Sequence, residues 1–338
     1  MAESFFELSA QDRADALEVA AGQAGRPAEL LEKDIWVVWT LDVLFRTPFA
    51  NALTFKGGTS LSKVYGVIDR FSEDVDLTYD IRALLPELAA GEGDPIPSSR
   101  SQADQITKKV RGLLPEWVSG EPRETLLEAA TEAGLADVEL RVEGANLVLG
   151  YPHSVSATSD YVRPEVLVEF GARSSGQPSS IREVRCDAAP YVEGVRFPVA
   201  APRVMAAERT FWEKATAAHV YCLQQRLRSD RFARHWYDLA RLHTSGIVEL
   251  ALQNRSIASQ VARHKALFFR EKSIDGKVIS YLAAVDGELV LVPKGEALTN
   301  LSEDYDRMMT SGLLPTEAPG FDEVLEACSA IQERANQR

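Results

Sequence analysis

Residues 55–80 of this 338-residue chain read FKGGTSLSKVYGVIDRFSEDVDLTYD, and this stretch decides the fold. A short apolar run, residues 52–55, ends at a pair of glycines, and the residues after the pair have helical spacing. Residues 75–80 then alternate between apolar and polar side chains, as a half-buried strand does. The pattern therefore predicts a strand, a glycine turn, a helix and a second strand.

Two acidic residues separated by one position lie at the start of the second predicted strand, Asp74 directly before it and Asp76 within it. On an extended chain these side chains point to one face, while Val75 and Leu77 point to the core. Joining a nucleotide to a hydroxyl group requires metal ions held by carboxylates on a rigid support, which this pair provides. The alternative is that the acidic residues only coat a solvated face of the strand.

The glycine pair lies where the phosphates of a nucleotide could bind. Gly57 and Gly58 allow the backbone to approach a ligand closely, and Thr59 and Ser60 add hydroxyl donors at a helix start. The order of residues is not that of a P-loop, because G-x-x-x-x-G-K is absent. The alternative is a tight turn into a helix for which Thr59 is the N-cap.

The combination of KGGTSLSK with RFSEDVDL resembles the AbiEii/AbiGii toxin family, nucleotidyltransferase-like bacterial proteins encoded beside an antitoxin in type IV systems. The resemblance extends to LLEKDIWVVWTLDVLF (30–45), ERTFWEKATAAH (208–219) and RHWYDLARL (234–242). It implies an α+β fold: a polymerase-β-like core with a mixed sheet, N-terminal helices and a helical C-terminal lobe. We expect residues 1–200 to form the first lobe, with an insert near 85–135, and residues 201–338 the second.

The resemblance also implies roles for individual residues. Asp74 and Asp76 would bind metal, and Lys214 and Asp238 would complete the catalytic site. Glu169, near the end of the predicted strand 164–173, is a candidate third metal ligand; the alternative is a side chain turned to solvent. The predicted nucleotide-binding residues are Gly57, Gly58, Thr59, Ser60, Lys63, Arg70 and Lys214.

Lys214 and Asp238 also stand out in their own helices. Lys214 shares a helix face with mostly apolar residues, so it needs an anionic partner; the alternative is an ammonium group that reaches past that face to water. Asp238 has helical spacing to Arg234 and Arg241, and the alternative there is an ordinary ladder of surface ion pairs.

Residues 226–235, RLRSDRFARH, are the densest basic stretch of the chain. Arg226, Arg228, Arg231 and Arg234 are therefore candidates for binding an RNA backbone, although a solvated helix face explains them equally well. Ser72 lies two residues before Asp74, and the resemblance implies that phosphorylation near this point silences the enzyme. Added negative charge beside metal ligands has that effect.

The composition narrows the class of protein. The net charge of -13 disfavours diffuse wrapping of nucleic acid, so RNA binding needs a local basic face. The three scattered cysteines predict neither a disulfide framework nor a zinc site. No apolar run approaches the roughly 20 residues of a membrane-spanning helix, and residues 1–13 lack the basic flank of a signal peptide. We therefore expect a cytoplasmic protein.

The leading interpretation is a toxin that transfers a nucleoside monophosphate from a triphosphate to an RNA acceptor. The resemblance implies the 3' end of tRNA as that acceptor, Mg²⁺ or Mn²⁺ as the metal, and a cognate antitoxin encoded nearby. Two alternatives stay open. One is an AMP-transferring enzyme that modifies a protein hydroxyl group, and the other is a non-catalytic module that binds nucleotides.

Overall fold

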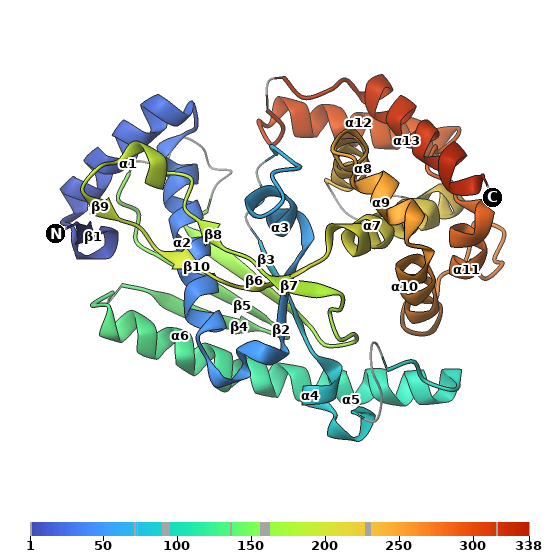
Figure 1. Cartoon of the computed structure of the whole chain (residues 1–338), viewed down its shortest axis with the longest axis horizontal. Helices are drawn as coiled ribbons and strands as arrows, with labels where there is room; N and C mark the ends of the chain where they lie inside the picture. Colours follow the sequence, from blue (N-terminus) through green and yellow to red (C-terminus); the bar gives the residue numbers. More distant parts are fainter. Residues whose placement is uncertain are drawn as a thin grey trace. The chain divides into compact units, whose positions relative to one another are not determined.

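The computed structural model describes residues 2–70, 72, 74–89, 95–135, 137–155, 163–226, 231–315 and 317–337. The chain divides into two compact units, which Figure 1 shows and which we describe separately. Unit 1 comprises residues 1–64, 73–91 and 108–204, and unit 2 comprises residues 65–72, 92–107 and 205–338. No helix in the described ranges is both long and apolar enough to cross a membrane.

A mixed sheet is the centre of unit 1, and among the described residues it has seven strands in the order β4-β5-β6-β3-β2-β11-β7. Strand β3 runs antiparallel to β2 and parallel to β6, and β11 runs parallel to β2. The predicted α+β class with a mixed sheet is therefore confirmed. The strands are β2 (Leu53–Lys56), β3 (Val75–Tyr79), β4 (Glu139–Glu143), β5 (Asn146–Gly150), β6 (Glu165–Gly171), β7 (Ser179–Ile181) and β11 (Arg203–Met205).

The two faces of the sheet differ in polarity. On β3, Val75 and Leu77 are buried, and they are registered beside Val168 and Phe170 of β6. Because side chains alternate along a strand, Asp76 points to the opposite face. That face is only half-buried at Asp76, so the acidic residue predicted to bind metal stands on the more open side.

The predicted insert covers the apolar face with two helices, α5 (Arg100–Ser119) and α6 (Glu121–Glu132), which run along the sheet in Figure 1. Trp117 stacks on Tyr79 of β3 with ring centroids 3.8 Å apart, and it meets Phe49 and Phe170 edge-on. Burial of a side chain as large as that of Trp117 contributes strongly to the stability of the packing between helix and sheet. The insert therefore completes the hydrophobic core of unit 1 beneath the acidic strand.

The two helices expected before the first strand are α1 (Ala10–Ala24) and α2 (Ala28–Phe45). Helix α2 packs against β6 and α6, and most of its residues are buried. Shorter elements of unit 1 are η1 (Phe5–Glu7), η2 (Pro48–Ala52), α3 (Gly57–Lys63), α4 (Ile81–Leu84), η3 (Pro86–Leu88), η4 (Ala189–Tyr191), and the paired strands β1 (Glu3–Ser4) with β9 (Val195–Arg196) and β8 (Val184–Arg185) with β10 (Val199–Ala200).

Unit 2 is helical, and Trp212, Tyr221 and Trp236 are fully buried in its core. Helical spacing in the sequence predicts helices near 203–227, 229–243, 247–267 and 320–337. Residues 203–205 instead form strand β11, and α12 lies outside these predicted ranges. The main helices are α7 (Ala207–Gln224), α8 (Arg234–Thr244), α9 (Ile247–Gln253), α10 (Arg255–Phe268), α12 (Glu296–Thr310) and α13 (Phe321–Asn336), with the short segments α11 (Tyr281–Ala283) and η5 (Ala284–Glu288).

Candidate functional site

The glycine turn and the acidic strand touch each other in unit 1. Gly57 opens α3 with φ of +82°, in the left-handed region that favours glycine. A Cβ added there would overlap the carboxylate of Asp76 and lie 2.8 Å from its Cγ. Position 57 must therefore be glycine both for its backbone angle and for the space that the Asp76 side chain occupies.

Two side-chain hydroxyl groups stabilise the glycine turn through hydrogen bonds to the backbone. Thr59 donates a hydrogen bond through Oγ1 to the backbone oxygen of Asp74 at 2.5 Å, and Ser60 donates through Oγ to the oxygen of Gly57 at 2.9 Å. The alternative that Thr59 is an N-cap is wrong, because the helix begins at Gly57 and Lys56 occupies the cap position without a side-chain bond. Thr59 instead ties α3 to the chain that enters β3.

Strand register places several polar side chains in one row across the open face of the sheet. Lys56 is paired with Asp76, Asp76 with Glu169, and Glu169 with Asn146. Registered partners on neighbouring strands point to the same face, so the carboxylates of Asp76 and Glu169 are neighbours. Sequence reasoning missed Asn146, because its place beside Glu169 follows from the β5–β6 register and not from any spacing along the chain.

The donor chemistry of this row fits a divalent cation. Carboxylate oxygens are the ligands that Mg²⁺ prefers, and Asp76, Asp74 and Glu169 would supply them. Two neighbouring carboxylates repel each other, and a cation between them removes that repulsion. Within the described ranges, no three His, Cys, Asp or Glu side chains already stand close enough together to hold a metal ion. The metal assignment of these residues therefore stays a prediction.

Lys63 and Arg70, both predicted to bind the nucleotide, are held by carboxylates. The ammonium group of Lys63 contacts Asp34 and Asp187 in unit 1, and the Arg70 guanidinium contacts Asp238 in unit 2. Their proposed contacts to phosphate stay predictions. So does the regulatory role of Ser72, which is half-buried in the structure.

In unit 2, Asp238 of α8 is fully buried between two cations. Arg70 donates two hydrogen bonds to it, Nε to Oδ1 at 2.7 Å and Nη2 to Oδ2 at 2.8 Å. Lys214 of α7 contacts Oδ2 through Nζ at 2.8 Å. The alternative of a surface ladder around Asp238 is therefore wrong. The alternative that the Lys214 ammonium reaches water is also wrong, because its side chain is 10% exposed and the expected anionic partner is Asp238.

Arg70, Asp238 and Lys214 form a triad in which the neighbouring charges shift the pKa values of Asp238 and Lys214. Burial raises the pKa of Asp238, but the charges of Arg70 and Lys214 outweigh burial and hold that pKa below its usual range. Burial lowers the pKa of Lys214 and Arg70 lowers it further, whereas Asp238 opposes the shift. Asp238 is therefore a stable anion and a poor proton acceptor, held between two cations.

A second carboxylate fixes the start of α8. Asp304 of α12 is buried and accepts hydrogen bonds from the backbone nitrogens of Arg231 at 3.0 Å and Ala233 at 2.8 Å. A carboxylate in this position satisfies backbone donors that have no partner within the helix. Asp304 therefore helps to place Asp238 one turn further along α8.

The predicted RNA-binding arginines are only partly described. Arg228 lies outside the described residues, Arg234 is exposed and Arg231 is half-buried. Arg226 lines a pocket of about 450 Å³ together with Lys272 and others in unit 2. The structure therefore leaves the RNA-binding role of these arginines a prediction.

Comparisons with known proteins identify the class of protein. The sequence model of the family described as nucleotidyl transferase AbiEii toxin, type IV toxin–antitoxin system, matches residues 40–327, most of the chain. The chain therefore belongs to the AbiEii family of nucleotidyltransferase toxins, which confirms the resemblance seen in the sequence. Membership implies a nucleoside triphosphate as substrate and a cognate antitoxin.

Among solved structures, the chain is similar to MenT4, a nucleotidyltransferase toxin from Mycobacterium tuberculosis H37Rv. The similarity covers 94% of this chain and 99% of the MenT4 chain, with 17% sequence identity and a TM-score of 0.43. A search of curated proteins found no match.

We predict that Gly57→Ala lowers nucleotidyl transfer by at least roughly 100-fold, because the added Cβ displaces the Asp76 carboxylate. The matched control is Gly194→Ala, since Gly194 has φ of +80° and nothing within 4 Å of an added Cβ. Both variants carry a similar backbone cost, so Gly194→Ala measures the effect of the backbone angle without the overlap with Asp76. Equal loss of activity in the two variants would contradict the role given to the contact with Asp76.

We predict that Asp238→Asn destabilises unit 2 by about 3–5 kcal/mol, because it leaves two buried cations without their shared anion. Chemical denaturation measures this change. The control is Asp69→Asn, whose partner Arg241 lies at the surface and whose loss costs about 0–1 kcal/mol. A similar, small effect of both substitutions would show that the triad contributes little to stability.

Proposed function

We propose that this toxin transfers a nucleoside monophosphate from a nucleoside triphosphate to an RNA hydroxyl group, with the 3' end of tRNA as the acceptor. The observation that carries the proposal is the contact between the glycine turn and the acidic strand, in a chain of the AbiEii family. The attacking oxygen forms a bond to the α-phosphorus, and the bond to pyrophosphate breaks.

In this proposal, Asp74, Asp76 and Glu169 hold Mg²⁺ or Mn²⁺ on the open face of the sheet. The metal, when bound, neutralises charge on the phosphates and orients the attacking and leaving oxygens. Asp76 supports this arrangement because it lies beside both Glu169, through strand register, and the Gly57 turn. The phosphates would then rest on the backbone of Gly57 and Gly58.

The proton of the attacking hydroxyl group needs an acceptor. Asp238 is a poor one, because Arg70 and Lys214 hold its pKa below its usual range even though burial raises it. We therefore assign that role to Glu169, a half-buried carboxylate beside Asp76. Asp238 instead holds the ammonium group of Lys214 in place within unit 2.

A protein acceptor is the second candidate, because the net charge of -13 opposes approach of a nucleic acid backbone. The basic stretch 226–235 favours RNA over a protein acceptor, since it offers a local cationic surface. Arg226 and Lys272 line one pocket in unit 2, together with the acidic Glu271. RNA therefore stays the leading proposal.

Incubation with each α-labelled nucleoside triphosphate, Mg²⁺ and total bacterial RNA tests the proposal. We expect label on small RNA with the unaltered chain, and only background label with Asp76→Asn, because the amide is a poorer metal ligand. The control is Asp80→Asn directly after the same strand, because the Asp80 carboxylate already contacts Arg82.

Each outcome of the labelling separates the candidates. Label on protein and not on RNA would overturn the RNA proposal in favour of the protein acceptor. Nucleotide binding without transfer to any acceptor would favour a non-catalytic module. Label that persists with Asp76→Asn would contradict the role of the acidic strand.

A further inference from the structure

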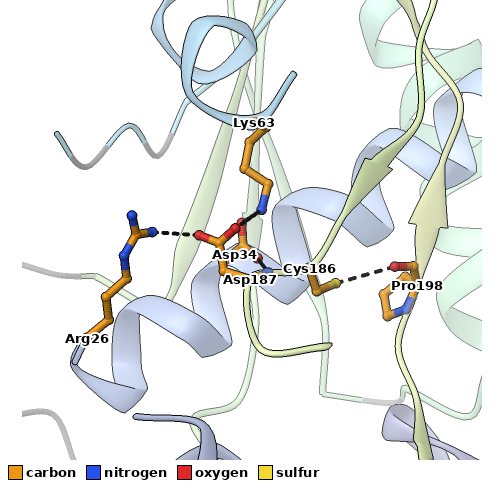
Figure 2. Close-up of polar contacts among 6 residues, drawn as sticks. All are labelled: Arg26, Asp34, Lys63, Cys186, Asp187 and Pro198. Carbon is orange, nitrogen blue, oxygen red and sulfur yellow. Dashed lines mark hydrogen bonds and ion pairs between the residues drawn. The ribbon is translucent and has the colours of Figure 1, made fainter. Parts of the chain in front are cut away.

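An ion cluster in unit 1 lies at the end of α3 that is remote from the glycine turn. Figure 2 shows the Lys63 ammonium group between two carboxylates, with Nζ 2.6 Å from Oδ1 of Asp34 and 2.6 Å from Oδ1 of Asp187. Arg26 binds the other oxygen of Asp187 at 2.6 Å, and the backbone nitrogen of Asp187 donates to Oδ2 of Asp34 at 2.6 Å. These four residues form the α3 anchor cluster.

The anchor cluster joins segments that are far apart in the sequence. Asp34 belongs to α2, Lys63 is the last residue of α3, and Asp187 follows β8. The Lys63 side chain is 7% exposed and that of Asp34 10%, so the contact between these two residues is shielded from water and from salt. Removing one partner of a buried ion pair leaves an uncompensated charge, so it disturbs the local structure more than the loss of an exposed ion pair does.

Helix α3 needs such an anchor because it is too short to be stable alone. It spans Gly57–Lys63, begins with two glycines and has no side-chain cap at its start. Isolated helices shorter than about 12–15 residues are marginal in water, so tertiary contacts must hold α3. Thr59 fixes the first turn to the chain before β3, and Lys63 fixes the last turn.

The same geometry separates Lys63 from the glycine turn. A helix rises about 1.5 Å per residue, so Lys63 starts about 9 Å along the axis from Gly57. Burial lowers the pKa of Lys63, but Asp34 and Asp187 outweigh it and raise that pKa, so the side chain stays charged. To bind a phosphate, Lys63 would have to leave both carboxylates.

We infer that Asp34, Asp187 and Lys63 are positioning residues, which fix α3 and thereby hold the Gly57–Gly58 turn ready for the phosphates of the nucleotide. Lys63 acts through the helix and does not touch the nucleotide. The inference rests on the proposed function of the turn, and it changes the role that the sequence pattern assigned to Lys63.

Asp34→Asn separates this inference from direct phosphate binding, because the two roles predict opposite effects. If the cluster positions α3, loss of the carboxylate weakens binding of ATP, GTP, CTP or UTP with Mg²⁺ by roughly 10- to 100-fold. If Lys63 is itself a phosphate ligand, the same substitution frees it, and binding stays equal or becomes tighter. Calorimetric titration measures the affinity, and tighter or unchanged binding would overturn the inference.

Hydrogen–deuterium exchange of the nucleotide-free protein gives the second measurement. We expect faster exchange of the backbone amides of α3 in Asp34→Asn, with less change in β3 and β6. Lys63→Met should have the same effect, and the double variant should be no worse than either single variant, because all three break one cluster. Unchanged exchange of α3 would also overturn the inference.

Two further variants keep the test decisive. Asp187→Asn alters a side chain that is 35% exposed, so it tests the cluster even if Asp34→Asn does not fold. Glu183→Gln removes an exposed ion pair with Arg185 in the same unit and should change neither measurement. If the unaltered chain binds no nucleoside triphosphate, the proposed function fails, whereas the exchange of α3 still decides whether the cluster anchors the helix.

Discussion

The carboxylate of Asp76 occupies the space that a side chain at position 57 would fill, and unit 1 is built to keep it there. Strand β3 lies between β2 and β6, which fixes the backbone from which the Asp76 side chain extends. Trp117 packs behind the strand on Tyr79, and Thr59 ties α3 to Asp74 in front of it. A carboxylate held against a glycine turn is arranged before any substrate binds, which is what metal-assisted transfer requires.

Unit 2 also fixes a carboxylate, but it does so through buried ion pairs. The buried carboxylate of Asp238 binds both Arg70 and Lys214. A second buried carboxylate, Asp304, binds the backbone at the start of α8, the helix to which Asp238 belongs. Burying charges is costly, so such groups persist where their geometry serves a function or where every partner is satisfied. Unit 1 contains a similar buried ion pair, between Lys63 at the end of α3 and Asp34. In each unit, charged side chains are thus held in place by side chains of opposite charge.

Local sequence patterns predicted the central strands, the glycine turn and most helices, because alternation and helical spacing are local properties. The same patterns could not show that Asp238 is buried, since its arginine neighbours in α8 suggest a surface and its actual partner Arg70 is distant in sequence. Nor could they place Asn146 beside Glu169, which depends on strand register, or show that the partners of Lys63 come from α2 and the segment after β8. Ion pairs between residues that are far apart in the sequence therefore cannot be predicted from local sequence patterns.

Mn²⁺ binding followed by electron paramagnetic resonance, with and without a nucleoside triphosphate, tests the acidic strand most directly. We predict that the unaltered chain binds Mn²⁺ with the nucleotide, and that Asp76→Asn and Glu169→Gln each weaken that binding while the protein stays folded. Undiminished binding of Mn²⁺ and nucleotide by both variants would contradict the assignment, because the metal and the phosphates would then be held elsewhere.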